Sequence, residues 1–206
     1  MSEKKLIWCP IDIPKFPYPD FDLPTSSTRW KFWDFKKITK SVESNDDPDH
    51  LIQNAIAEIE SIIYEEYPDL IEWINLFPFK TIRNIKFNTQ IEDCLAHIDF
   101  SYENCKTDAD KELWNNNSIN EPCGYRTLIS GSKTNMQYAI HNGEKIYTTI
   151  PDDTDTFVLN STTLLHGVDA EPGRKLIYMH FEIDTSANEK LIQSSLEKYS
   201  DYAIYG

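Results

Sequence analysis

The sequence Leu-Ala-His-Ile-Asp-Phe occupies residues 95–100 and places a histidine and an acid two positions apart inside an apolar run. Successive side chains of a β-strand point to opposite faces, so His97 and Asp99 would project from one face, about 7 Å apart along the strand. Such a pair has two interpretations: an ion pair or satisfied core histidine, or two ligands of a metal. Other residues of the chain are needed to distinguish these two interpretations.

Short stretches with strand character surround this run, with only turns and loops between them. The expected strands are 82–87, 94–100, 124–130, a hairpin over 136–150, 157–159, 162–166 and 175–183. The hairpin is expected to turn at Asn142-Gly143, a dipeptide that suits a type I′ turn. This succession predicts an antiparallel sandwich or jelly roll.

Helical patterns flank the strands. Asp47 suits a helix cap and Pro48 the first helical position, and the residues up to 63 carry one apolar face. Pro68 interrupts this helix, and a shorter piece continues it. After the last strand, the Ser186-x-x-Glu189 pattern is a capping box and predicts a C-terminal helix.

The N-terminal part is rich in proline and aromatic residues. Five prolines lie within residues 8–24, which blocks helix formation and predicts an extended arm packed on the domain surface. Residues 30–35 predict a first strand. We therefore expect one domain over 1–206: arm and first strands (1–46), packing helices (47–78), β-helix core (79–184) and C-terminal helix (185–206).

The composition of the chain limits the kinds of fold, partner and cellular location that it can have. A chain of 206 residues with 40% hydrophobic content can bury a real core. Its net charge of -14 repels phosphate backbones and anionic lipid, so neither a nucleic-acid nor a membrane partner is expected. The short apolar run near the N-terminus and the lack of long apolar stretches predict a soluble, cytoplasmic protein. Its four cysteines form no Cys-x-x-Cys pair, so no zinc knuckle or redox dithiol is indicated.

His166 supplies a third candidate ligand. It ends the expected strand 162–166 and follows His97 by 166 − 97 = 69 residues, which is enough for several strands to intervene and return beside the first. Two imidazoles and a carboxylate on one side of a metal form a facial triad, whose open positions suit Fe(II) that binds a cosubstrate and dioxygen. Catalytic zinc uses the same ligands, so the triad alone leaves both metals open.

Arg174 favours the iron interpretation. It lies 174 − 166 = 8 residues after His166, at the start of the last long strand. A guanidinium there would hold a carboxylate by a bidentate, charge-assisted pair. A buried cation near a metal makes an anionic ligand its natural partner. The alternative is that Arg174 pairs with Asp169 or Glu171 on the surface.

The order His97-x-Asp99, several strands, His166 and then Arg174 resembles the Fe(II)/2-oxoglutarate-dependent oxygenases. The resemblance covers roughly the second half of the chain. It implies a mainly β fold, a cupin-like double-stranded β-helix or jelly roll with flanking α-helices. It also implies that His97, Asp99 and His166 bind Fe(II) and that Arg174 binds the C5 carboxylate of 2-oxoglutarate. The implied reaction consumes dioxygen, releases succinate and CO2, and hydroxylates the substrate.

Departures from subfamily patterns narrow this resemblance. Plant-type members carry Arg-x-Ser where this chain has Arg-Lys-Leu at 174–176, and the nucleic-acid demethylases use a second arginine after the first. Halogenases leave out the acid, whereas Asp99 is present. The Gly-Tyr-Arg stretch, residues 157–166 and the compact size are similar to small aspartyl/asparaginyl- or prolyl-hydroxylase-like proteins of bacteria and phages. They imply as substrate an amino-acid-like small molecule or a side chain of a peptide or protein.

Other polar residues are candidates for the pocket. Tyr125 and Arg126 point to opposite faces of one strand, so at most one of them enters the site. Arg126 would bind a substrate carboxylate, or Tyr125 would form a hydrogen bond with 2-oxoglutarate; the alternative for each is an ordinary packing or surface role. Asn160 is a candidate substrate-binding residue that shares the His166 face if the strand is unbroken. The long polar loop 102–123 is either a lid or a surface excursion.

Two other classes of function remain open. The same ligands would suit a cupin-like metal-binding module or a zinc-dependent protein without oxygenase activity. A scaffold protein that keeps the fold without chemistry is the third class, and the complete ligand set argues against it.

Overall fold

The computed structural model describes residues 5–20, 30–34, 68–90, 92–98, 124–161 and 164–206. Its strands are β1 (Leu6–Pro10), β2 (Trp30–Asp34), β3 (Phe79–Gln90), β4 (Cys94–His97), β5 (Gly124–Ser130), β6 (Tyr138–His141), β7 (Glu144–Tyr147), β8 (Thr156–Leu159), β9 (His166–Val168), β10 (Lys175–Ile183) and β11 (Ile204–Tyr205). Its helices are α3 (Pro68–Ile74), α5 (Thr185–Tyr199) and the 3-10 helix η2 (Ser200–Tyr202). The described chain is therefore mainly β, as expected.

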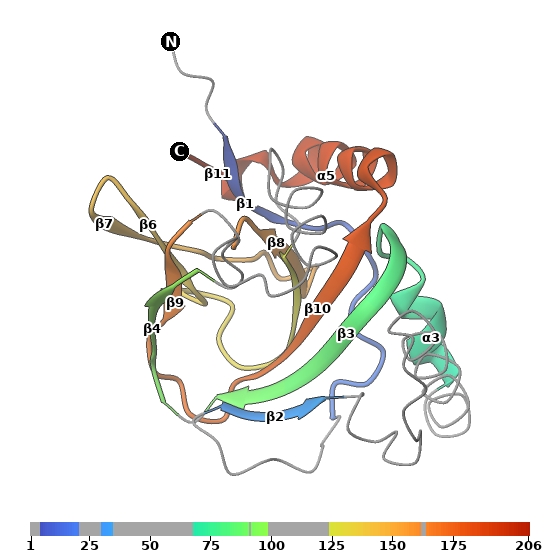
Figure 1. The fold of residues 1–206 in the computed structure, drawn as a ribbon, viewed down its shortest axis with the longest axis horizontal. Coiled ribbons are helices and arrows are strands. Elements are labelled where there is room, and N and C mark those ends of the chain that lie inside the picture. Colours follow the sequence, from blue (N-terminus) through green and yellow to red (C-terminus); the bar gives the residue numbers. More distant parts are fainter. Residues whose placement is uncertain (1–4, 21–29, 35–67, 91, 99–123, 162–163) are drawn as a thin grey trace, which may run out of the picture.

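The strands form two antiparallel sheets (Figure 1). One is seven-stranded in the order β11-β1-β8-β5-β10-β3-β2, and the other is four-stranded in the order β4-β9-β6-β7. Between β3 and β10 the pairing is nested: β3 pairs with β10, β4 with β9, β5 with β8 and β6 with β7. This stretch therefore pairs like one long hairpin whose strands are divided between the two sheets.

Side chains of the seven-stranded sheet alternate between two apolar clusters. The inter-sheet cluster consists of Ile7, Trp8, Leu128, Met136, Ala139, Ile150, Phe157, Leu159 and Leu176. It includes a residue of β6, so it fills the space between the sheets. The helix-side cluster takes the other faces of the same strands, such as Val158 and Ile177, and adds residues of α3 and α5. Figure 1 accordingly shows both helices on the side of the long strands away from β4 and β9.

Several expected elements are confirmed. β5 and β10 have the bounds expected for 124–130 and 175–183. The β6–β7 hairpin turns at Asn142 and Gly143, whose φ angles of 52° and 83° are the positive values that a type I′ turn requires. The expected strand 82–87 is longer, because β3 pairs with β2 on one side and β10 on the other. α3 confirms the short helical piece after residue 68, whereas the helix expected over 47–63 and the loop 102–123 lie outside the described residues.

The expectation of a surface arm is wrong for its first residues. Residues 6–10 form β1, which lies between β11 and β8 and buries Trp8 and Cys9 completely. The prolines that argued against a strand begin at its last residue, Pro10, so residues 6–9 keep their N–H donors for the ladder. Burial raises the pKa of the Cys9 thiol to about 12, which makes it an unreactive core residue.

The cap of the C-terminal helix is also different from the expected one. α5 begins after Asp184, whose carboxylate accepts the N–H of Ala187 at 3.0 Å, and Ser186 lies inside the first turn. An aspartate satisfies the same free N–H groups as serine and adds a negative charge at the positive end of the helix dipole. The capping-box pattern therefore found the helix but placed its start two residues late.

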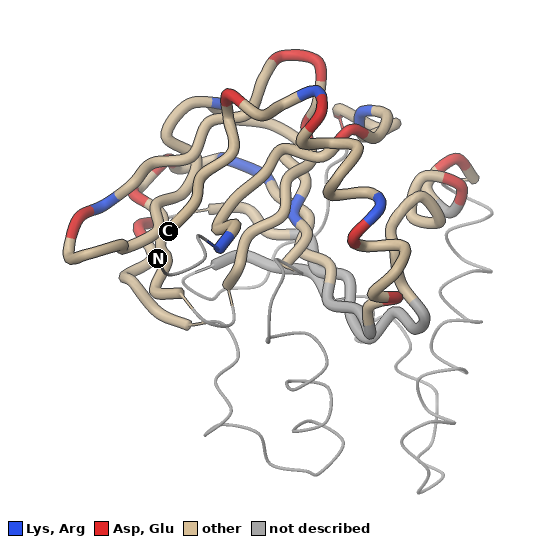
Figure 2. Tube along the Cα trace, turned by 90° about the horizontal axis from the view of Figure 1, so that it is seen from above, with Lys and Arg blue, Asp and Glu red and all other residues tan. Residues whose placement is uncertain are grey.

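Charged residues are distributed over the described chain without a single basic face. Figure 2 shows acidic and basic positions interspersed along the trace. Within the described residues, the helices are all too short or too polar to cross a bilayer.

Candidate metal site

The structure brings His97 and His166 together. They lie on the neighbouring antiparallel strands β4 and β9 and are register partners. Their ring centroids are 4.7 Å apart and the ring planes are inclined by 45°. His166 is buried, whereas His97 is exposed at the end of β4.

Both imidazoles are held in the same way. The Nδ1 atom of His97 lies 2.8 Å from the carbonyl oxygen of Leu95, and that of His166 lies 3.1 Å from the carbonyl oxygen of Leu164. A carbonyl oxygen only accepts, so each Nδ1 carries a proton, and in the neutral form of each ring the lone pair lies on Nε2. Histidines that bind metals almost always have their second nitrogen fixed by such an acceptor.

The spacing of the two rings fits a shared metal ion. Two imidazoles that bind one ion at right angles, each through a nitrogen about 2.1 Å from it, have ring centroids roughly 4.5 Å apart. The observed separation of 4.7 Å is close to this value. The separation of the rings is therefore the one that two adjacent coordination positions of one ion would require.

The expected third ligand, Asp99, lies outside the described residues. Within the described part of the chain, no group of three or more His, Cys, Asp or Glu side chains is placed to hold a metal. The thiol of Cys94 lies 3.5 Å from Nδ1 of His97, on the side of the ring opposite the Nε2 lone pair. The described part of the candidate site therefore consists of two imidazoles.

His166 begins its strand, contrary to the expectation that it ends one. β9 runs from His166 to Val168, and residues 164 and 165 are not part of it. Leu164 and Leu165 suggested a buried strand, but Leu165 is 44% exposed and its carbonyl accepts the N–H of Ile140 before the regular pairing starts. His166 is thus held in place as the first paired residue of β9.

Gly167 lies in the middle of β9. A Cβ at this position would overlap the hydroxyl of Tyr138 and the carbonyl of Cys94. Glycine is needed here because β4 and β6 approach β9 from both sides, which sets the backbone next to His166.

Gly167→Ala is therefore expected to lower the free energy of unfolding by about 1–3 kcal/mol, the usual cost of overpacking. Chemical denaturation of the wild-type and Gly167→Ala proteins measures the change in the free energy of unfolding. Gly143→Ala is not an equivalent control, because Gly143 has a positive φ angle that alanine rarely adopts. Gly124→Ala, at another close contact but in the seven-stranded sheet, is the matched comparison for the cost of overpacking. Unchanged stability in Gly167→Ala would contradict the tight packing around β9.

Arg126 is the nearest cation to this pair among the described contacts. It lies on β5 and is 2% exposed, with Nη2 3.3 Å from Nε2 of His166 and Nη1 donating to Oε1 of Gln137 at 3.0 Å. Its guanidinium also lies over the ring of Tyr178, 4.7 Å from the centroid. Arg126 therefore extends from the seven-stranded sheet to the histidine of the four-stranded sheet.

Tyr125 lies on the opposite face of β5. Its hydroxyl donates to Oδ1 of Asn188 on α5 at 2.6 Å, and its ring packs edge-on against Phe77 in the helix-side cluster. The structure thus brings Arg126, and not Tyr125, to the histidine pair.

Asn160 is buried directly after β8, and its N–H donates to the carbonyl of Ile7 on β1 at 2.9 Å. The condition for sharing the His166 face was one unbroken strand, but β8 ends at Leu159 and a new strand begins at His166. The structure therefore places Asn160 beside β1.

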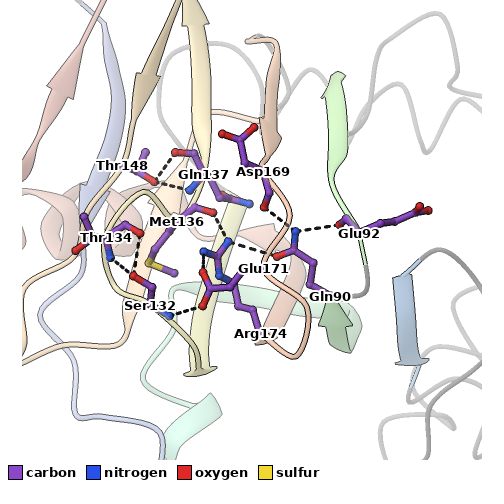
Figure 3. Close-up of polar contacts among 10 residues, drawn as sticks. All are labelled: Gln90, Glu92, Ser132, Thr134, Met136, Gln137, Thr148, Asp169, Glu171 and Arg174. Atoms are coloured by element: carbon purple, nitrogen blue, oxygen red, sulfur yellow. Dashed lines mark hydrogen bonds and ion pairs between the residues drawn. The ribbon is translucent and has the colours of Figure 1, made fainter.

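Arg174 is buried in a network of polar contacts (Figure 3). Its Nη1 donates to the carbonyl of Met136 at 2.7 Å and to Oε1 of Gln90 at 3.4 Å, and its Nη2 forms an ion pair with Glu171. The second carboxylate oxygen of Glu171 accepts the N–H of Ser132 at 2.6 Å. The Glu171 partner that the sequence offered as a surface alternative is thus present, but the guanidinium is only 3% exposed.

Sequence reasoning missed Gln90, which is completely buried beside Arg174. Its side-chain amide donates to the carbonyls of Glu92 and Asp169, at 3.0 and 2.8 Å. Its backbone N–H donates to the carbonyl of Arg174, and its carbonyl accepts the N–H of Gly173. Gln90 therefore joins the end of β3, the end of β9 and the turn before β10.

Asp169, the other suggested partner of Arg174, points to the strand β7 instead. Its carboxylate accepts hydrogen bonds from Tyr147 at 2.6 Å and Lys145 at 2.9 Å. These two donors lower the pKa of Asp169 below its ordinary value. These two hydrogen bonds link the residue after β9 to β7, on the exposed side of the four-stranded sheet.

A scan of protein-family models finds no match to this chain, and a search of curated proteins also finds none. The site geometry and the strand pairing therefore carry the functional argument.

Proposed function

We propose that this protein is an Fe(II)- and 2-oxoglutarate-dependent oxygenase that hydroxylates its substrate and releases succinate and CO2. The observation that carries the proposal is the cross-strand pair of His97 and His166, whose rings are 4.7 Å apart and whose Nδ1 atoms are both held by carbonyls. Two imidazoles with Nδ1 fixed by a carbonyl and the lone pair on Nε2 are suited to one divalent ion, which on His166 would take the place of the contact with Arg126. Asp99, two residues after His97, is the proposed carboxylate ligand.

The strand pairing supports a double-stranded β-helix as the finer description of the fold. In a jelly roll, eight strands pair as a long hairpin that rolls into two sheets. The nested pairs from β3–β10 to β6–β7 have this arrangement. In it, the two proposed histidine ligands come from the end of β4 and the start of β9, which are neighbours at one edge of the smaller sheet.

The proposed roles of the residues follow from their positions. His97, Asp99 and His166 would hold the iron, which supplies the oxidation chemistry together with 2-oxoglutarate and dioxygen. Arg174 is the proposed partner of the C5 carboxylate, and its contact with Met136 of the inter-sheet cluster supports a position between the sheets. Since Glu171 pairs with Arg174 in this structure, the oxo acid would have to replace that carboxylate.

The proposed substrate is an amino-acid-like small molecule or a side chain of a peptide or protein. A net charge of -14 disfavours nucleic acid as the substrate. The proposal does not depend on Tyr125 or Asn160, which the structure places against α5 and β1.

Anaerobic titration with Fe(II) and then 2-oxoglutarate tests the proposal. Wild-type protein should develop the weak visible charge-transfer band of the iron chelate, and Asp99→Ala should lose most of it. No band in wild-type protein, or an unchanged band in the variant, would count decisively against an oxygenase.

The same ligands also suit zinc, so a zinc-dependent or cupin-like binding protein is the alternative. Metal analysis of protein purified without added iron, together with an assay for succinate formation, separates the two. Bound zinc without succinate formation under any substrate-free or substrate-containing condition would favour the alternative.

A further inference from the structure

Arg126 reaches the position that a metal ion would occupy on His166. Its Nη2 lies 3.3 Å from Nε2, and Nδ1 of the same ring is held by the carbonyl of Leu164. An arginine is always charged and only donates, so the contact requires an unprotonated Nε2. The guanidinium therefore uses the lone pair that an ion bound to His166 would need.

An ion on His166 would displace Arg126 only a short way. The guanidinium is anchored by the hydrogen bond to Gln137 and by the ring of Tyr178, which is also its cross-strand partner on β10. The backbone of Arg126 is fixed between β8 and β10 in the seven-stranded sheet. A displaced guanidinium would thus stay beside the ion, with its donors directed toward the other ligands of that ion.

From this geometry we propose that Arg126 binds the metal-proximal carboxylate of the oxo acid, the end that chelates the iron. This inference rests on the proposed function and adds a residue to it. A carboxylate matches the planar fork of a guanidinium, and an anion beside the ion removes the repulsion between Arg126 and the metal.

Arg174 and Arg126 would then hold opposite ends of one dicarboxylate. Both arginines are buried. Arg126 is the register partner of Tyr178 on β10, and Tyr178 follows Arg174 by four residues. Four residues of strand span about 13 Å, and the guanidinium groups of the two arginines bond to neighbouring residues, Arg174 to the carbonyl of Met136 and Arg126 to Gln137, so the proposed diacid would lie between them. The arrangement selects an oxo acid with a carboxylate at each end over a monocarboxylate.

Binding measurements on Arg126→Met, with Co(II) as a spectroscopic substitute for iron, test this role. Oxalate is the first probe, because it has the chelating end of 2-oxoglutarate without the distal arm, and 2-oxoglutarate is the second. We expect Co(II) alone to bind at least as tightly as in wild-type protein, because a positive charge beside His166 is gone. The affinities of the Co(II) form for oxalate and for 2-oxoglutarate should both fall about 10–100-fold, the usual loss for a charge-assisted hydrogen bond.

Two further variants sharpen the result. Arg126→Lys keeps the charge without the planar fork, so it should bind Co(II) like wild type and lose less oxalate affinity than Arg126→Met. Lys145→Met removes a positive charge from the exposed rim of the four-stranded sheet and should change neither affinity.

The outcomes separate this inference from the proposed function. Wild-type protein that binds no Co(II), or binds it without oxalate and 2-oxoglutarate, would refute the oxygenase. Wild-type binding of all three, with unchanged oxalate affinity in Arg126→Met, would refute only the role of Arg126. An equal loss of Co(II) and oxalate affinity in both Arg126 variants would make Arg126 a structural residue and would also refute the inference.

Discussion

Replacing His166 by alanine is expected to lower the affinity for Fe(II) or Co(II) by at least about 100-fold, because loss of a partner behind a ligand already costs about 10–100-fold. The imidazole is buried and its ring is fixed by Leu164, so water is a poor replacement for it. Isothermal titration under anaerobic conditions measures the affinity, and circular dichroism checks that the variant is folded.

His97→Ala should have a comparable effect on metal affinity, since both rings are proposed to bind one ion. His141→Ala is the matched control, because His141 also lies in the four-stranded sheet, at the end of β6 and opposite Glu144. A folded His166→Ala protein that binds metal like wild type, or an equal loss in His141→Ala, would contradict the proposed metal site.

Local sequence patterns predicted the strands whose boundaries are marked by neighbouring residues in the sequence. The turn at Asn142-Gly143 and the short runs of strand-forming residues along β5 and β10 depend on neighbouring residues, so the bounds of these elements could be predicted directly. β1 could not be read in this way. Its prolines pointed to an arm, and only the pairing with β8 and β11, each more than a hundred residues away, makes it a central strand.

The candidate site likewise combines features that neighbouring residues predict with features that depend on long-range strand pairing. The types of residue in His-x-Asp and the distant His166 suggested ligands, but the register that sets His97 opposite His166 comes from the pairing of β4 with β9. The contact of Arg126 with His166 crosses between two sheets. No sequence spacing encodes such a contact, so the sequence could only limit the choice to one of two adjacent residues on β5. Gln90 had no chemical signature at all, because its role lies in linking three chain segments.

The contacts of Arg174 predict that its replacement by alanine has a large effect on stability and on 2-oxoglutarate binding. Arg174→Ala removes three contacts of a buried guanidinium and leaves Glu171 without its ion-pair partner. Because Glu171 is partly exposed and can regain water, we expect a loss of about 2–3 kcal/mol in the free energy of unfolding, below the range for a fully buried pair. Stability alone would not reveal a role in binding, so the informative comparison is between ligands.

Arg174→Ala is expected to raise the concentration of 2-oxoglutarate needed for half-saturation by at least about 10-fold, while metal affinity changes much less. Glu171→Gln should act in the opposite direction and tighten 2-oxoglutarate binding severalfold, because an uncharged amide competes less well than a carboxylate for the guanidinium. Oxalate, which lacks the distal carboxylate, should bind both variants like wild type. Anaerobic titrations of the metal-loaded proteins measure all three affinities. If Arg174→Ala lost metal and 2-oxoglutarate to the same degree and Glu171→Gln gained nothing, the Arg174–Glu171 pair would be a structural link between the turn before β10 and residue 132, and the distal carboxylate would need another partner.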